Sequence, residues 1–162
     1  MSKFGLRKLG FGILLFGMAV CCYTASPVKA AETDVPIDDT NFPDSTFQKY
    51  VKSNFDTDKD GSLSESERNA VKKIVVNVDP FSSQTKITSL AGIEYFPNLT
   101  VLECESNSLA GLDVTKNKKL QELNCDKNNL QSLDVSQNTE LIKLQCRYNQ
   151  LPGLDVTKNT NL

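Results

Sequence analysis

The sequence has no histidine among its 162 residues, so it lacks the side chain most often used as a general base. It also lacks a Gly-x-Ser-x-Gly nucleophile motif and a glycine-rich phosphate loop. No other arrangement of reactive side chains stands out. The sequence therefore predicts a protein without enzymatic activity.

Basic residues are scarce once the N-terminal segment is set aside. Residues 1–30 hold four of the 18 Lys and Arg and none of the 20 Asp and Glu, so the remainder has 14 basic and 20 acidic residues, a net charge of −6. Nucleic-acid affinity depends on clustered Lys and Arg that neutralise phosphates. The sequence therefore predicts no nucleic-acid partner.

A long apolar run is missing as well. Residues 11–20 read FGILLFGMAV, which is shorter than the roughly 20 apolar residues that cross a bilayer. Basic residues precede this run, and Val28 and Ala30 place small residues before a cleavage position. Residues 1–30 are therefore predicted to be a secretory signal peptide, and the mature chain to have no membrane span.

Three cysteines follow the predicted signal, an odd number for an exported protein, but their spacing is constant. They belong to a 21-residue repeat that starts at Leu99 and reads LTVLECESNSLAGLDVTKNKK, LQELNCDKNNLQSLDVSQNTE and LIKLQCRYNQLPGLDVTKNTN. Leucines recur at four positions, and the remaining columns are Cys104, Cys125 and Cys146 and Asn107, Asn128 and Asn149. A single copy cannot bury its apolar face, so the copies are expected to stack into a solenoid.

Each copy predicts one short parallel strand. In the first copy the apolar and polar residues alternate, so Leu102 and Cys104 are expected inside and Glu103 outside. The asparagine column is expected to satisfy backbone groups of the turn after the strand. The stacked cysteines would lie about 4.8 Å apart with parallel Cβ vectors, which suits neither tetrahedral zinc nor disulfides. They are predicted to be buried free thiols.

The rest of each copy returns across the other side of the solenoid. About ten residues, such as 111–119, remain for this path, too few for a full helix with its turns. A 3₁₀ turn or an extended segment is expected there, with Leu112 and Val114 facing the core.

The LxxLxCxxNxL register resembles the leucine-rich repeat family, and the cysteine column is similar to the ladder of internalin J-type surface proteins of Gram-positive bacteria. The resemblance implies an α+β fold: an EF-hand-like N-terminal helical cap, then a solenoid of short parallel strands with a 3₁₀ or extended convex side. It also implies adhesion or host interaction, often with a C-terminal wall-sorting signal. Because the sequence stops one residue into a repeat, we expect more chain beyond residue 162.

The segment before the regular repeats divides into three parts. Residues 31–41 are polar and predicted to be a flexible linker. Residues 42–79 are predicted to form the cap and the first strand, with one helix capped by Asp44 or Ser45 and a second that begins at Ser64 with capping-box spacing to Glu67. Ile74 is expected to pair with the repeat strands. Residues 80–162 are assigned to the repeats, with extra residues in the range 80–85.

Residues 56–67, DTDKDGSLSESE, lie between the two predicted helices. Every ligand position fits the EF-hand template for Ca²⁺: carboxylates at Asp56, Asp58 and Asp60, the backbone carbonyl of Ser62, a water held by Ser64, and bidentate Glu67. The alternatives are a solvated polar turn and a dockerin, which carries two such loops. Since carboxylates gathered around one point repel each other without a cation, we expect a structural calcium site rather than a sensor.

The outward strand positions predict a partner-binding concave face. Its candidate residues share exposure on successive strands: Glu103, Glu105, Glu122, Asp126, Lys143, Arg147 and Tyr148. The predicted function is a secreted or cell-surface, monomeric adhesion module for a protein or glycan ligand on a host or neighbouring cell, held at the wall by a missing C-terminal region. The alternative is a targeting module of a larger extracellular enzyme whose catalytic domain follows residue 162.

Overall fold

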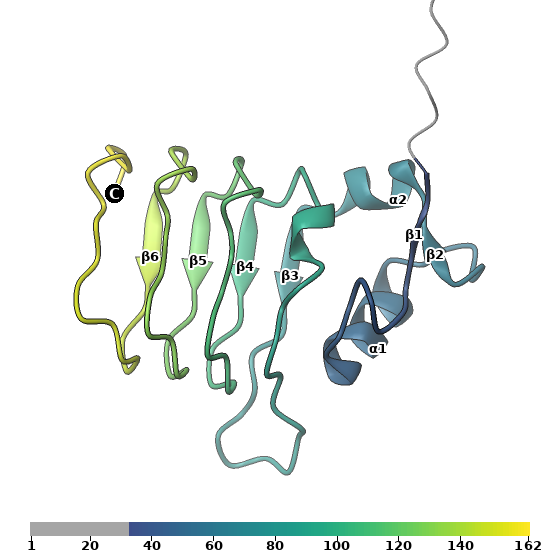
Figure 1. Cartoon of the computed structure of the whole chain (residues 1–162), viewed down its shortest axis with the longest axis horizontal. Coiled ribbons are helices and arrows are strands. Elements are labelled where there is room, and N and C mark those ends of the chain that lie inside the picture. Colours follow the sequence, from purple (N-terminus) through teal and green to yellow (C-terminus); the bar gives the residue numbers. More distant parts are fainter. Residues whose placement is uncertain (1–32) are drawn as a thin grey trace, which may run out of the picture. The chain divides into compact units, whose positions relative to one another are not determined.

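The computed structural model describes residues 33–162, which combine two short helices with a parallel sheet (Figure 1). The predicted signal peptide, residues 1–30, and the first two residues of the predicted linker lie outside the described residues. Within the described range no helix is both long enough and apolar enough to cross a membrane. The α+β class expected from the repeat is confirmed.

Four strands form the parallel sheet in the order β3-β4-β5-β6. They are β3 (Lys73–Val75), β4 (Val101–Glu103), β5 (Glu122–Asn124) and β6 (Lys143–Gln145). The register pairs Ile74 with Leu102, Leu102 with Leu123, and Leu123 with Leu144. The 21-residue period and the irregular first unit therefore pair as predicted, and the longer first unit projects as a loop over residues 79–86 (Figure 1).

The core consists of leucine columns that run through the stacked repeats. Leu99, Leu120 and Leu141 begin the three regular copies and are fully buried. Other columns join them in one cluster: Leu102 and Leu123, Leu109 and Leu130, and Val114 and Val135. Each repeat therefore stabilises its neighbour by burying apolar surface, about 25 cal/mol per Å².

The return path opposite the sheet is short, as predicted. The irregular first unit, which precedes Leu99, has a single 3₁₀ turn on this path, η1 (Ile93–Tyr95). The next two units are extended here, and Asp113 forms a parallel bridge with Asp134. Leu112 and Val114 are both buried. No α-helix lies on this path within the described repeats.

A helix-loop-helix precedes β3. Helix α1 (Ser45–Asn54) begins at Asp44, whose carboxylate accepts the N–H groups of Thr46 and Phe47 at 2.9 and 3.0 Å. Helix α2 (Glu65–Ala70) begins at Ser64 with a complete capping box to Glu67. Both predicted helix starts are confirmed.

The described part of the predicted linker is structured, and the expectation of a flexible segment fails there. Strand β1 (Val35–Pro36) pairs antiparallel with β2 (Ser62–Leu63), and Val35 is buried against the core. The N–H of Ile37 extends this pairing to the carbonyl of Gly61 at 2.9 Å. A two-residue strand that contains proline carries almost no sequence pattern, which explains why it was missed.

The helix-loop-helix is fastened to the first repeat by polar and aromatic contacts. The second carboxylate oxygen of Asp44 accepts the N–H and the hydroxyl of Thr88, both at 2.8 Å. The Tyr95 hydroxyl donates to Asn41 at 2.8 Å, and its ring centroid lies 5.8 Å from that of Phe42. These contacts cover the end of the apolar core that the first strand would otherwise expose.

Candidate calcium loop and binding face

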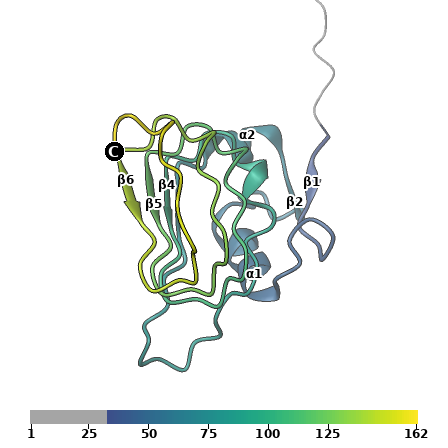
Figure 2. The same ribbon diagram turned by 60° about the vertical axis from the view of Figure 1, so that its left-hand side comes forward.

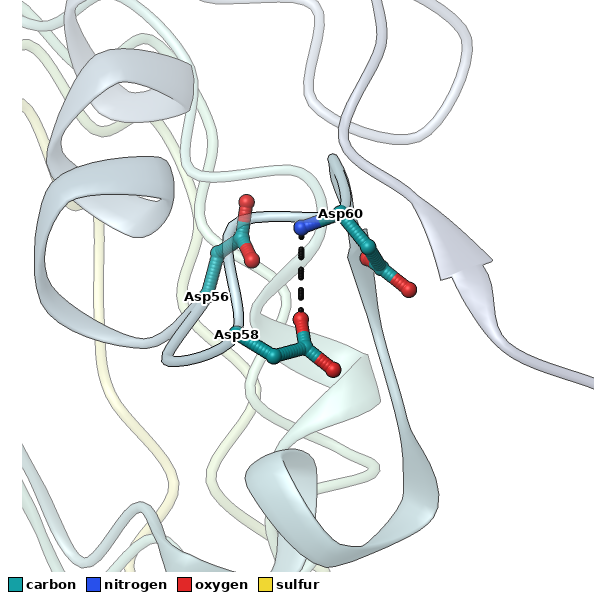
Figure 3. Close-up of side chains that lie close together, drawn as sticks. All are labelled: Asp56, Asp58 and Asp60. Atoms are coloured by element: carbon teal, nitrogen blue, oxygen red, sulfur yellow. Dashed lines mark hydrogen bonds between the residues drawn. The ribbon is translucent and has the colours of Figure 1, made fainter.

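Three of the predicted calcium ligands converge in the loop between α1 and β2. Oxygens of Asp56, Asp58 and Asp60 lie within 4.8 Å of one another (Figure 3). The chain makes this convergence by turning sharply, with positive φ at Lys59 (63°) and Gly61 (88°). Glycine adopts such angles without the Cβ clash that other residues incur, which suits Gly61 to this position.

Backbone hydrogen bonds order the carboxylates within this turn. The N–H of Asp60 donates to Asp58 at 3.2 Å, the N–H of Gly61 to Asp56 Oδ2 at 3.1 Å, and the N–H of Ser62 to Asp60 at 2.7 Å. Asp56 is only 6% exposed, and its Oδ1 is buried without a hydrogen-bond partner. A buried carboxylate oxygen without a partner is costly, so this atom is the least satisfied part of the loop.

Glu67 reaches the loop from α2 but is engaged by other groups. Its Oε1 accepts the N–H and the hydroxyl of Thr57 at 2.6 and 2.7 Å, and its Oε2 accepts the N–H and the hydroxyl of Ser64 at 2.9 and 2.8 Å. Burial alone would raise the pKa of Glu67, but these hydrogen bonds outweigh it and lower the pKa to about 2. Glu67 therefore stays ionised and ties the two ends of the loop together.

The predicted binding residues on strands β4 to β6 lie on one face of the sheet, in rows set by the parallel register. One row joins Val101, Glu122 and Lys143, and the next joins Glu103, Asn124 and Gln145. We call this surface, with the residues that continue it at 105 and 147–148, the open face. Figure 2 shows β4, β5 and β6, the strands that carry this face, side by side along the stack.

Ion pairs cross the open face. Glu103 pairs with Lys73 and Glu105 with Lys127, each at 2.7 Å, and Glu122 pairs with Lys143 at 3.5 Å. For Glu103 and Glu105 the hydrogen bond from the paired lysine is the main cause of a lowered pKa. The charges of the open face are therefore partly neutralised within it.

One predicted binding residue, Asp126, lies in surroundings that differ from those expected, and another, Tyr148, is exposed as predicted but has a left-handed backbone conformation. Asp126 is buried, 8% exposed, because its carboxylate accepts the backbone N–H of Arg147 in the next repeat. Tyr148 is 76% exposed with φ of 55°, and Ser106 and Lys127 at the equivalent positions have φ of 63° and 54°. The left-handed conformation is thus a property of the repeat rather than a strain particular to Tyr148.

The predicted asparagine column is confirmed and holds neighbouring repeats together. Asn128 Nδ2 donates to the carbonyls of Cys104 and Cys125 at 3.0 and 3.1 Å, and its Oδ1 accepts the N–H of Leu109 at 3.1 Å. The cysteines beneath are free thiols; Cys104 and Cys125 are buried and Cys146 is partly buried. Burial raises the pKa of Cys125 to about 12 and that of Cys104 well above its ordinary value.

A second asparagine column on the return path was not predicted. Asn117, Asn138 and Asn159 are buried, and each donates from Nδ2 to two backbone carbonyls of the preceding repeat. Their Oδ1 atoms have no hydrogen-bond partner. The sequence did contain the relevant pattern, because these asparagines recur with the same 21-residue period as the leucines.

Comparison with known proteins identifies related folds. No protein-family model and no curated protein matches the chain. A solved structure, the functional domain of InlJ from Listeria monocytogenes, which includes a cysteine ladder, matches with 32% identity and a TM-score of 0.70 over 82% of this chain and 28% of that one.

Two further internalins of Listeria monocytogenes share the fold. InlF matches with 21% identity and a TM-score of 0.66 over 82% of this chain and 37% of its own, and internalin C2 with 23% and 0.63 over 80% and 56%. The chain thus spans less than two thirds of the length of each. With the cysteine ladder and the repeat register, these likenesses show that the chain has an internalin-like leucine-rich repeat fold.

Proposed function

We propose that the chain is an exported, cell-surface binding module that attaches to a protein or glycan ligand on another cell through its open face. The observation that carries this proposal is the register of the sheet, which sets polar side chains from successive repeats in parallel rows on one surface. Extended solenoid faces of this kind serve as binding surfaces. The likeness to an internalin domain at 32% identity supports the same function.

Arg147 and Tyr148 are the residues of this face best suited to contact a partner. Both are exposed, and within residues 33–162 no ion pair engages the Arg147 guanidinium. The glutamates of the neighbouring rows are already paired with lysines, so they have less charge to offer a partner. Tyrosine and arginine are enriched in interface hot spots, because they combine a large contact area with directed hydrogen bonds.

The binding proposal is tested with labelled chain on cultured epithelial cells and on a glycan array. Replacing Arg147 and Tyr148 by alanine should reduce binding at least about tenfold, as for a hot-spot pair. The matched control replaces Lys116 and Lys118, which are exposed on the opposite side of the repeats, and should bind like the unaltered chain. Equal binding by the two folded double variants would overturn the role of the open face.

We further propose that the loop at residues 56–67 binds calcium as a structural ion. Three carboxylates within 4.8 Å repel each other, and the buried Oδ1 of Asp56 lacks a partner, so a cation would relieve both costs. Oxygen donors of this kind suit Ca²⁺, and millimolar extracellular calcium would fill even a weak site. Both carboxylate oxygens of Glu67 accept hydrogen bonds, from Thr57 and from Ser64, so bidentate coordination by Glu67 requires these hydrogen bonds to rearrange.

The calcium proposal is tested by thermal unfolding in millimolar calcium and in chelator. Calcium should raise the melting temperature of the unaltered chain, since a ligand that binds the folded state alone stabilises it. The double variant Asp58→Asn, Asp60→Asn should lose this shift, whereas Asp34→Asn, an exposed change outside the loop, should keep it. A melting temperature that is the same in calcium and chelator would refute the site.

A further inference from the structure

The edge of β3 that faces away from β4 is open beyond Val75. The N–H groups of Val76 and Val78 donate to the carbonyls of Glu103 and Glu105 at 2.8 and 3.0 Å, so the backbone groups of Asn77 point the other way. No hydrogen bond within residues 33–162 engages the backbone N–H or C=O of Asn77. An unpaired strand edge is a template for a further strand.

A hollow of about 470 Å³ lies along this edge. Its walls are Thr46, Lys49 and Tyr50 of α1, the backbone and valines of residues 75–78, and residues 84, 85 and 87 of the loop that lengthens the first repeat. Figure 1 shows α1 on the side of β3 opposite β4, and the N–H of Val75 donates to the Tyr50 hydroxyl at 3.3 Å. The volume lies in the range of sites that bind ligands.

The hydrogen-bonding groups of this hollow suit a peptide backbone. Asn77 offers one donor and one acceptor in the spacing of a strand ladder, and Val75 and Val78 supply apolar contacts beside them. Such a site recognises main-chain groups first and alternate side chains second. A glycan would leave the valine surfaces in contact with hydroxyl groups, so a peptide is the better fit.

The charge of the hollow selects among peptides. Lys49 is the single charged residue of the lining, and no ion pair within residues 33–162 engages its ammonium group. An acidic side chain on the incoming strand would form an ion pair with the Lys49 ammonium group. Phe81, on the loop that also supplies residues 84 and 85 of the lining, is 96% exposed.

We propose that the open edge of β3 and the hollow beside it bind an extended segment of a partner protein that carries an acidic side chain, by adding a strand to the sheet. This site goes beyond the open face proposed above, because it uses backbone groups at the margin of the sheet and the side of α1. A partner could occupy it whether or not Arg147 and Tyr148 contribute to binding.

The experiment pans a library of displayed random octapeptides on the purified chain. Enriched peptides should alternate apolar and polar residues around an Asp or Glu. Their synthetic counterparts should bind about tenfold more weakly to Lys49→Glu, which reverses the charge, and to Thr85→Trp, which fills the hollow. Lys52→Glu on the same helix and Ser83→Trp on the same loop lie outside the lining and should bind like the unaltered chain.

Methylation of the peptide backbone tests the added strand directly. Two versions of a peptide are compared, one methylated at its odd-numbered amides and one at its even-numbered amides. One version should lose binding and the other should keep it, because only every second residue faces the β3 edge. Failure to enrich any peptide, equal binding to the filled variant, or equal sensitivity at all amides would overturn the proposal. Should Thr85→Trp not fold, the Lys49→Glu comparison and the methylation series decide the outcome, and neither depends on the open-face variants.

Discussion

The side-chain amide of Asn128 donates a hydrogen bond to the backbone carbonyl of Cys104, 24 positions earlier in the chain, at 3.0 Å. The same amide also serves its own repeat, and its oxygen accepts the N–H of Leu109. One buried side chain therefore satisfies backbone groups in two repeats that would otherwise lie in an apolar core. The ladder explains how a solenoid with three-residue strands keeps its register.

Replacing Asn128 by alanine should destabilise the chain by about 2–4 kcal/mol, because it leaves several buried backbone groups without partners. Urea unfolding followed by circular dichroism measures this loss. Asn129→Ala is the matched control, since that neighbouring side chain is exposed, and it should change stability by less than about 0.5 kcal/mol. Similar losses for the two variants would contradict the structural role of the column.

The cysteine ladder predicts an order of chemical reactivity. Burial raises the pKa of all three thiols, and Cys146 is the least buried of them, so it should react first with iodoacetamide. Cys104 and Cys125 should be labelled only when the chain unfolds. Mass spectrometry of peptides after timed labelling, in buffer and in urea, measures the order. Rapid labelling of Cys104 in the folded chain would show that the ladder opens.

Most of the solenoid was predictable because its information is repeated. A leucine or asparagine that recurs every 21 residues constrains strand register and burial together, which is why the pairing of Ile74 with Leu102 followed from spacing alone. The second asparagine column has the same 21-residue period, so its burial was predictable in the same way. The helix starts were predictable because capping depends on local side chains.

Features that depend on a single long-range contact were not predictable. Strand β1 exists because Val35 and Pro36 meet β2, and nothing within its two residues indicates a strand. Asp126 looked like a surface residue by alternation, yet its carboxylate accepts a backbone N–H from the next repeat and is buried. In the acidic loop, spacing placed the three aspartates together, but the capture of Glu67 by Thr57 required the folded geometry.

Asp44 predicts an acid-sensitive link between α1 and the first repeat. Burial alone would raise the pKa of this carboxylate, but hydrogen bonds from Thr88, Phe47 and Thr46 lower it below the ordinary 3.8. A depressed pKa stabilises the folded state above the unfolded pKa, and this stabilisation is lost as the pH falls through the folded value. The free energy of unfolding, measured in chelator from pH 6 downward, should therefore decrease once the pH is below about 4.

The variant Asp44→Asn should have a lower free energy of unfolding at pH 6, because it removes the charge that the four hydrogen bonds stabilise. For the same reason its free energy of unfolding should decrease less on acidification than that of the unaltered chain. Ser45→Ala, an exposed change at the adjacent residue, should keep the profile of the unaltered chain. An identical pH profile for Asp44→Asn and the unaltered chain would show that the link does not govern acid stability.

Alanine substitution should have very different effects on stability at Gly92 and at Gly111. Gly92 has φ of 106°, and a Cβ there would lie 2.3 Å from the Phe42 ring and 2.8 Å from the Asn41 carbonyl. Gly92→Ala should therefore cost about 3 kcal/mol or more, by backbone strain and by displacing a fully buried aromatic ring. Gly111→Ala is the control, because its Cβ would meet nothing within 4 Å and its φ is not positive. Chemical denaturation should find it within about 1 kcal/mol of the unaltered chain; a comparable loss at both glycines would mean that the close packing of the helix-loop-helix on the first repeat does not determine stability.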